Sequence, residues 1–530
     1  MKWIFLFTAL LTQIAGVQAM IVEANKPQRI ELNTQQDTFL KIDKPGYYRG
    51  YIRSQGYINQ VMAFNSAGES IKNLLSHPSR EMEIFWYIEQ ADTYQIKMEV
   101  DEKEPAKVEM QLNPIPLKVD QYFSPKVPML SPLISRTATD IQGNVKETEK
   151  QFWHTIESTG SPLVEYQSDN KAIITFLFRG DVNNVRLLGA PYGGHAQMSQ
   201  IEGSEIWFRS FEVPNTTRLS YRIAPNVPQL AQDMNREQRK AVLATAAPDP
   251  LNLYPSFGPD SDLFGAASTL TLNKAESDSV AKEQGNPKGQ LRHFSYRESA
   301  NPETRRISLY EPNEVYPLSK TSPLLVLFDG DSYLNKVPTP LVMDNLTASK
   351  AIPPMRVVFI NPARPSLRAK ELTPNKAFAD MLANELMPWL CHVHSICPNA
   401  EDTVLSGSSF GGLASMFIAL EHPERFGKVL SQSGSFWWKP KNAQSQVSTE
   451  QSWMGELVES SDKKNIQIYL NAGLFETEPV NASIYQTNKN LFSTLEAKGY
   501  PVTFKSTASG HDYYSWRVLL ADGLTTLFSH

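Results

Sequence analysis

The chain has 530 residues, of which 41% are hydrophobic and 20% are charged, and this ordinary composition excludes collagen-like, coiled-coil and intrinsically disordered proteins. Its 51 Lys and Arg against 56 Asp and Glu give a net charge of −5, whereas nucleic-acid-binding proteins usually carry a basic excess, so no nucleic-acid partner is expected. Two cysteines are too few for a disulfide scaffold or a multi-cysteine zinc site, and the length predicts several domains.

The N-terminus has the pattern of a secretory signal peptide. Lys2 supplies a positive charge, residues 3–11 are mostly apolar, and the segment ends at Ala19 with the small residue of a cleavage site. The alternative, a single membrane anchor, would need a longer apolar run, and no later segment has about 18 uninterrupted apolar residues. We therefore expect removal of residues 1–19 as a signal peptide, export to the periplasm and no stable insertion into a membrane.

Residues 21–115 contain short segments in which apolar and polar residues largely alternate, for example 38–42 and 94–100. Pro, Gly and Asn separate these segments, a pattern that is typical of a small β-sandwich. The region has no visible pairing of a nucleophile with a base, so we expect it to bind a ligand or to act as a spacer.

Two linkers and a second β-rich region follow. Residues 116–150 are rich in Pro, Lys, Glu, Asp and Thr and predict a linker. Strand patterns then recur over residues 151–226, which indicates an immunoglobulin-like β-sandwich. Clusters of Pro, Asn, Asp and Ser over residues 227–290 predict a second linker.

From residue 291 to residue 530, short apolar strands alternate with amphipathic helices. Predicted strands include 324–328 and 403–406, and predicted helices include 376–389 and 484–498. Such alternation indicates βαβ units and a mainly parallel sheet, which places its chemistry at the carboxyl ends of the strands.

A candidate nucleophile follows one of these strands. Residues 407–411 have the sequence GSSFG, which matches the G-x-S-x-G nucleophile elbow between a strand and a helix. The sharp turn would expose the Ser409 hydroxyl and point the amide of Phe410 toward an oxyanion. The alternative is a Gly/Ser turn before a buried helix. The fold class that we predict is therefore a multidomain chain with a C-terminal α/β-hydrolase preceded by two β-sandwiches.

The nucleophile needs a base and an acid, which in this fold follow it in the order acid and then histidine. Of nine histidines, His511 is the one in a loop between the last predicted strand and a terminal helix, so we assign it as the base. Glu476, in the loop after the strand at 466–470, is our choice for the acid, with Glu478 second. Surface positions for these three residues are the alternatives.

The second oxyanion amide should come from the loop after an earlier strand. Gly330 and Asp331 follow the strand at 324–328 and are the candidates.

Several longer motifs resemble the enterochelin (enterobactin) esterases, which are α/β-hydrolases that cleave the trilactone backbone of catecholate siderophores. These motifs are GSSFGG at 407–412, HPERFG at 422–427, LSQSGSFWW at 430–438, RAKEL at 368–372 and GHD at 510–512. Upstream, Phe152-Trp153 and DPLN at 249–252 are similar to the family's N-terminal domain and linker, so the resemblance covers roughly residues 150–530. It implies Ser409 as nucleophile, His511 as base and Glu476 as acid.

A ferric tris-catecholate is anionic and aromatic, so the resemblance also suggests a role for three further residues. Arg368 could supply positive charge, and Trp437 and Trp438 could offer flat faces to catechol rings. Alternatively, Arg368 pairs with Glu371 and both tryptophans pack in the interior. The sequence has no metal-ligand cluster, so we expect no metal site and no cofactor, and any iron would arrive with the substrate.

Our leading hypothesis is an exported serine esterase that hydrolyses catecholate siderophores, ferric or iron-free, for iron acquisition. The alternatives are a carbohydrate or feruloyl esterase of the same fold, because fold alone does not select a substrate, and a non-catalytic protein that binds siderophores or glycans. Whether Cys391 and Cys397 form a disulfide is left open by their spacing.

Overall fold

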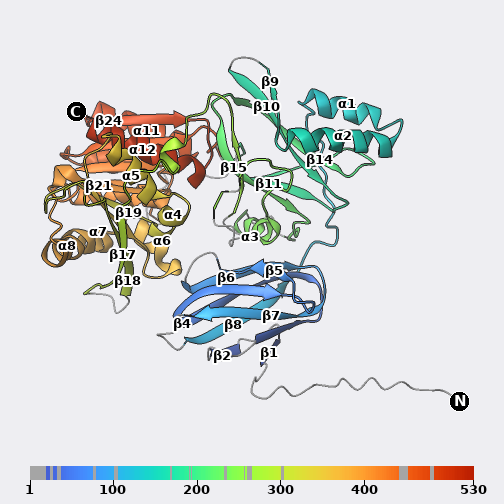
Figure 1. The fold of residues 1–530 in the computed structure, drawn as a ribbon, viewed down its shortest axis with the longest axis horizontal. Coiled ribbons are helices and arrows are strands. Elements are labelled where there is room, and N and C mark those ends of the chain that lie inside the picture. Colours follow the sequence, from blue (N-terminus) through green and yellow to red (C-terminus); the bar gives the residue numbers. More distant parts are fainter. Residues whose placement is uncertain are drawn as a thin grey trace. The chain divides into compact units, whose positions relative to one another are not determined.

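The computed structural model divides into two compact units, residues 1–116 and residues 117–530 (Figure 1). It describes residues 20–529 except 24–27, 33–37, 76–78, 101–105, 168–169, 190, 193, 232–234, 256, 259–265, 300–303, 441–451 and 478–482. The predicted signal peptide, residues 1–19, lies outside the described residues, as does Glu478.

The first unit is a single eight-stranded sheet in the order β1-β3-β7-β4-β8-β2, with β5 and β6 pairing with β4. Its centre is β4, whose first half pairs with β6 and β8 and whose second half pairs with β5 and β7. Ile52 from the first half and Val61 from the second half share one buried core with Trp86 of β6, so the sheet folds around this core. The strands are β1 (Met20–Glu23), β2 (Gln28–Leu32), β3 (Thr38–Ile42), β4 (Gly46–Phe64), β5 (Ser70–Asn73), β6 (Ser79–Ile88), β7 (Asp92–Val100) and β8 (Ala106–Ile115).

The second unit begins with two helices, α1 (Pro132–Asp140) and α2 (Val145–Thr159), where we predicted a linker over residues 116–150. That prediction was wrong because it relied on composition alone. The side chains of Ser131 and Asn144 accept hydrogen bonds from amides of the first turns, which are N-caps that favour a helix start. One face of α2 buries Phe152 and Trp153 in a core shared with strand residues, while its charged face is exposed.

Two four-stranded antiparallel sheets follow and enclose a core that includes Phe176, Leu187 and Trp207. Their orders are β13-β14-β10-β9 and β12-β11-β15-β16. The strands are β9 (Leu163–Tyr166), β10 (Lys171–Arg179), β11 (Val185–Gly189), β12 (His195–Gln197), β13 (Ser199–Gln200), β14 (Ile206–Pro214), β15 (Arg218–Pro225) and β16 (Ser268–Thr271). We call these eight strands the sandwich.

The predicted linker at 227–290 is also partly folded. It supplies α3 (Asn235–Thr245), which contacts β15, and it supplies β16, which pairs with β15 at the edge of the second sheet. A four-residue strand is too short to show a convincing alternation, and for this reason the sequence analysis missed it.

The remaining residues form an eight-stranded sheet in the order β17-β18-β20-β19-β21-β22-β23-β24. β17, β18 and β20 pair antiparallel, and the other pairs are parallel, which confirms the predicted mainly parallel sheet. The strands are β17 (Gln290–Arg297), β18 (Thr304–Glu311), β19 (Leu324–Phe328), β20 (Arg356–Ile360), β21 (Thr403–Ser408), β22 (Lys428–Gln432), β23 (Gln467–Gly473) and β24 (Val502–Thr507).

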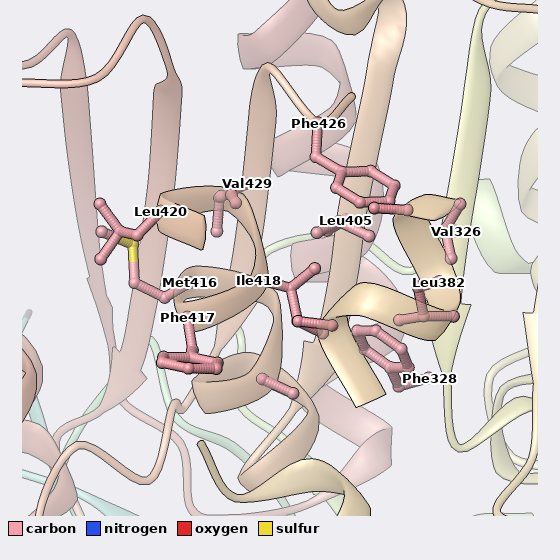
Figure 2. Close-up of a cluster of buried hydrophobic side chains, with 14 of the residues drawn as sticks. Val326, Phe328, Leu382, Leu405, Met416, Phe417, Ile418, Leu420, Phe426 and Val429 are labelled. Carbon is pink, nitrogen blue, oxygen red and sulfur yellow. The ribbon is translucent and has the colours of Figure 1, made fainter. Parts of the chain in front are cut away.

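Helices pack on this sheet and bury two apolar cores. In one core, Met416, Ile418 and Leu420 of α9 lie near Leu405 and Val429 of the sheet (Figure 2). The helices are α4 (Gly330–Asn335), α5 (Thr339–Ala348), α6 (Arg368–Leu372), α7 (Lys376–Met381), α8 (Met387–His394), α9 (Phe410–Glu421), α10 (Trp453–Ser460), α11 (Ile484–Ala497) and α12 (Tyr513–Phe528). A Cys391–Cys397 disulfide joins α8 to the loop that follows it.

None of the helices in the described ranges has the length and hydropathy that crossing a membrane would require.

Candidate active site

Ser409 occupies a sharp turn between β21 and α9. Its backbone has φ 57° and ψ −117°, a conformation that a non-glycine residue adopts only where its surroundings impose it. The flanking glycines make this turn possible, because a Cβ on Gly407 would lie 2.9 Å from the Gly411 backbone and one on Gly412 would lie 2.5 Å from Ser431 Oγ. The backbone therefore has the geometry of a nucleophile elbow.

Hydrogen bonds to the adjacent strand hold this turn. The Ser409 amide donates to the Gln432 carbonyl at 2.9 Å, and the Ser435 amide donates to the Ser409 carbonyl at 3.0 Å. The two hydroxyls are also close, with Ser435 Oγ 3.1 Å from Ser409 Oγ. The amide of Phe410 is the first of α9, a position that has no acceptor within the helix.

His511 and Glu476 form a close pair at the ends of two neighbouring strands. Glu476 follows β23, His511 follows β24, and Glu476 Oε1 lies 2.5 Å from His511 Nδ1. The second oxygen of Glu476 accepts a hydrogen bond from the Gly473 amide at 2.7 Å, so both carboxylate oxygens are engaged. Because the Glu476 side chain is only 1% exposed, these contacts fix its orientation and, through it, that of the imidazole.

A cavity of about 600 Å³ is lined by most of the residues that we predicted for the site. They are Ser409, Phe410, Glu476, His511, Arg368 and Trp437. Glu478, our second choice for the acid, lies outside the described residues.

Three predicted site residues are described in the structure and none of them lines this cavity: Gly330, Asp331 and Trp438. The Asp331 amide, proposed as an oxyanion donor, already donates to Asn361 Oδ1 at 2.8 Å. Gly330 is buried, with Phe359 where its Cβ would project. Trp438 packs on the hydrophobic core and lies 5.7 Å from the Trp453 ring, so the packing alternative holds for this residue. The oxyanion role of Asp331 and the ligand-stacking role of Trp438 are corrected accordingly, and the oxyanion role of the Gly330 amide stays a prediction.

Arg368 makes a bidentate ion pair, but not with the partner that we considered. Its Nε and Nη2 donate to the two carboxylate oxygens of Asp329, each at 2.6 Å. Glu371 instead pairs with the buried Arg305. The Arg368 side chain keeps 34% of its surface exposed and lies over the Phe410 ring, 5.8 Å from its centroid, so it can still contact a ligand.

The opposite wall of the cavity was not predicted from the sequence. It consists of sandwich residues and α3, among them Leu188, Tyr192, Ser220, Arg222 and Arg239. Leu188, Ser220 and Arg222 lie within strands, Tyr192 lies in the loop between β11 and β12, and Arg239 lies in a region that we took for a linker, so no motif marks them. The only available signal was their side-chain chemistry, two arginines and a tyrosine.

Direct contacts join the sandwich to α12 and its N-terminal loop. Arg218 Nε donates to the Tyr514 carbonyl at 3.1 Å, and its guanidinium lies 3.8 Å from the Tyr514 ring centroid. The Ser220 amide donates to Asp512 Oδ2 at 3.3 Å. Because Asp512 is next to His511, this interface helps to position both walls of the site.

Over the described part of the chain, no group of three or more His, Cys, Asp or Glu side chains is placed to hold a metal ion.

Comparison with known proteins is consistent with this geometry. A family model described as "Putative esterase" matches residues 299–527, and one described as "Enterochelin esterase, N-terminal" matches residues 173–280. The iron(III) enterobactin esterase of Dickeya dadantii is 27% identical, over 72% of this chain and 93% of that protein. The iron(III) enterobactin esterase of Escherichia coli (strain K12) is 29% identical, over 62% of this chain and 81% of that protein.

Solved structures give the same result. The enterobactin esterase of Shigella flexneri, crystallised in the presence of enterobactin, has 26% identity and a TM-score of 0.57, covering 71% of this chain and 97% of that one. The ferric enterobactin esterase of Salmonella typhimurium has 25% identity and a TM-score of 0.59, covering 71% and 98%. The chain is therefore a hydrolase that acts on esters, and it is similar to the enterochelin esterases across both matched regions.

Proposed function

We propose that the protein is a serine esterase that hydrolyses the ester bonds of catecholate siderophores, with Ser409 as nucleophile, His511 as base and Glu476 as the acid that orients it. The observation that carries the proposal is that Ser409, at a strained elbow, and the His511–Glu476 pair line one cavity. The substrate class is proposed because similar proteins are named as iron(III) enterobactin and iron(III) salmochelin esterases.

Proton transfer follows from the hydrogen bonding of the imidazole. Because Nδ1 bonds to the carboxylate of Glu476, it carries the proton in the neutral ring and Nε2 is the basic nitrogen. Nε2 accepts the Ser409 proton as Oγ attacks the ester carbonyl, and the imidazolium that results is stabilised by Glu476. The imidazolium then protonates the departing alkoxide, and an acyl-enzyme remains. Water, deprotonated by the same nitrogen, releases the acid.

The oxyanion of the tetrahedral intermediate needs preorganised donors. The Phe410 amide at the start of α9 is the first of them, assisted by the positive end of the helix. The Ser435 hydroxyl, which lies 3.1 Å from Ser409 Oγ and lines the cavity, is the second donor that we propose in place of Gly330 or Asp331.

The rest of the cavity suits an aromatic acyl group. Trp437, Phe475, Tyr513 and Tyr192 contribute rings to its lining, and such rings stack on other aromatic groups. Crystals of the Shigella flexneri enzyme were obtained in the presence of enterobactin and of 2,3-di-hydroxy-N-benzoyl-serine, both of which carry a catechol ring. We propose the same class of substrate for this chain.

We also propose that the protein is exported to the periplasm, where it would serve iron acquisition. The signal-peptide pattern of residues 1–19 supports export, and the Cys391–Cys397 disulfide is a bond that persists in an oxidising compartment. N-terminal sequencing of the protein recovered from a periplasmic extract should begin at Met20. An uncleaved chain recovered from the cytoplasm would contradict export.

The substrate is tested by mass spectrometry of the products. Purified protein is incubated with enterobactin, iron-loaded and iron-free, and separately with a feruloyl sugar ester. We expect linear fragments and 2,3-dihydroxy-N-benzoyl-serine from enterobactin, with no product from the Ser409→Ala variant. Cleavage of the sugar ester alone would overturn the siderophore assignment.

A further inference from the structure

One face of the β12-β11-β15-β16 sheet is basic and borders the cavity. Leu188 of β11 is paired with His195 of β12 on one side and with Arg222 of β15 on the other, and paired residues point to the same face of a sheet. Arg186, two residues before Leu188, shares this face. Leu188 and Arg222 line the cavity, which identifies this face as the one turned toward Ser409.

Arg239 extends the basic face from α3. It lines the cavity, and its charge acts on His195 together with that of Arg186. Burial, aided by these two arginines, lowers the pKa of His195 to about 4, so this imidazole is neutral at pH 7 and the positive charge resides on the guanidinium groups. We call Arg222 and Arg239, which both line the cavity, the basic wall.

The charges around the cavity do not reflect the composition of the chain. The protein as a whole carries a net charge of −5. Among the described residues that line the cavity, however, four cations and two carboxylates are present: Arg222, Arg239, Lys336 and Arg368 against Glu476 and Asp512. The charge of Arg368 is offset by its ion pair with Asp329, which leaves three cations against the two carboxylates. Glu476 is bonded to His511, and Asp512 accepts amide hydrogen bonds from Ser220 and Ser515. The cavity therefore attracts anions, although ester hydrolysis itself requires only the oxyanion donors.

The iron-free and iron-loaded forms of a catecholate siderophore differ in charge, the property to which a basic wall responds. Free catechols keep their phenol protons at neutral pH, since an ordinary phenol has a pKa of about 10. Three doubly deprotonated catechols around iron(III) leave a net negative charge on the complex. Guanidinium groups recognise phenolate oxygens through charge-assisted hydrogen bonds, which are stronger than neutral ones.

We propose that the basic wall binds the anionic iron(III)–catecholate centre while Ser409, on the opposite wall, attacks an ester of the attached backbone. The sandwich thereby selects the iron-loaded substrate over the iron-free one. This inference rests on the proposed siderophore esterase activity, and it adds a binding role for the sandwich and a preference between two forms of one substrate.

The test compares Arg239→Gln and Arg222→Gln with a matched control, Lys240→Gln. The control removes one positive charge from the same helix as Arg239, at a position that does not line the cavity. The ratio of kcat/KM for iron-loaded to iron-free enterobactin is measured for each. We expect this ratio to fall about tenfold in each arginine variant, through a higher KM for the iron-loaded form, and to stay unchanged in the control.

Salt gives a second readout in the unaltered protein. The KM for the iron-loaded form should rise with ionic strength while that for the iron-free form changes little, because screening weakens exposed charge pairs. If the protein cleaves enterobactin but the ratio is the same in all four proteins, the basic wall is refuted and the proposed function survives.

A binding measurement tests the basic wall even if the unaltered protein does not cleave the siderophore. In a Ser409→Ala background, quenching of tryptophan fluorescence by iron(III) enterobactin reports affinity directly. A tenfold weaker Kd on adding Arg239→Gln supports the basic wall even if the unaltered protein fails to cleave the siderophore. An unchanged Kd refutes it.

Discussion

The two walls of the cavity are built from different kinds of backbone. On the hydrolase side, Ser409, Glu476 and His511 stand in loops directly after strands β21, β23 and β24. On the sandwich side, Arg222 lies within a strand and Arg239 within a helix. The first wall requires particular backbone conformations, such as the positive φ of Ser409, and the second requires only that side chains of the right charge face the cavity. This difference fits our proposal that the chemistry is located on one wall and substrate selectivity on the other.

Substitution of the nucleophile should have the largest effect. Ser409→Ala removes the hydroxyl oxygen that we propose as the nucleophile, so we expect kcat to fall by about 10⁵-fold on every ester, charged or neutral. Initial rates with an aryl ester and with enterobactin measure this. Circular dichroism checks that the variant is folded. Retention of even a tenth of the activity would assign the chemistry to another residue.

Glu476→Gln should come next. A carboxylate accepts hydrogen bonds at both oxygens, from His511 and from the Gly473 amide, whereas an amide has one acceptor and must lose one of these contacts. We expect kcat to fall by about 10³- to 10⁴-fold with little change in KM. Glu496→Gln, an exposed carboxylate on α11, is the matched control and should behave as the unaltered protein. A fall of less than tenfold in Glu476→Gln would exclude it as the triad acid.

The free energy of unfolding tests how α6, which carries Arg368 on the cavity wall opposite the sandwich, is held in place. α6 carries Arg368 on the cavity and Glu371 in the interior, where Glu371 pairs at 2.8 Å with Arg305, a side chain only 1% exposed. Glu371→Ala leaves a buried guanidinium short of one partner, so the free energy of unfolding should fall by about 3–5 kcal/mol. Urea denaturation measures this change, with Glu496→Ala as the control. A loss below about 1 kcal/mol would mean that Glu298 and the Asn361 carbonyl together satisfy Arg305.

The interface between the walls should show a smaller effect that depends on pH. Burial raises the pKa of Asp512 from its ordinary 3.8 to about 6, against the opposing effect of amide donors on Ser515 and Ser220. The folded protein thus holds the Asp512 proton more tightly than the unfolded chain does. Protonated Asp512 therefore adds to the free energy of unfolding. This stabilisation is complete below about pH 3.8, and it is lost as the pH rises through about 6.

Unfolding free energies at several pH values between 4 and 7 therefore test the interface. The unaltered protein should lose stability relative to Asp512→Asn as the pH rises, because the amide cannot ionise. Parallel profiles for the two proteins would show that Asp512 is not buried between the walls.

The same difference between the walls explains what the sequence could predict. Ser409, Glu476 and His511 could be predicted to lie together, as they do in the lining of one cavity, because short loops after strands have narrow backbone requirements and follow a fixed chain order. Trp437 and Trp438 could not be separated by pattern, since adjacent residues in an irregular segment point in directions that only packing decides. Asp331 failed as an oxyanion donor because Asn361, thirty residues away, occupies its amide.

Long-range packing also explains the errors in domain organisation. The charged residues of α2 have the composition of a linker. Only the packing of Phe152 and Trp153 on the sandwich strands shows that this segment is part of the folded unit. β16 becomes a strand only through its pairing with β15, and α3 is placed by its contact with that strand. Arg239 of the basic wall lies on α3, so its place beside the cavity could not be anticipated before that helix was placed.

The proposed proton transfer from Ser409 to His511 is tested most directly by covalent labelling of the nucleophile. The protein is treated with an aryl organophosphonate, digested, and analysed by mass spectrometry to locate the adduct. We expect a single adduct on Ser409, with labelling slowed at least about 100-fold in His511→Ala, because the imidazole accepts the proton as Oγ attacks. An adduct on a different residue, or an equal rate of labelling without His511, would contradict the account.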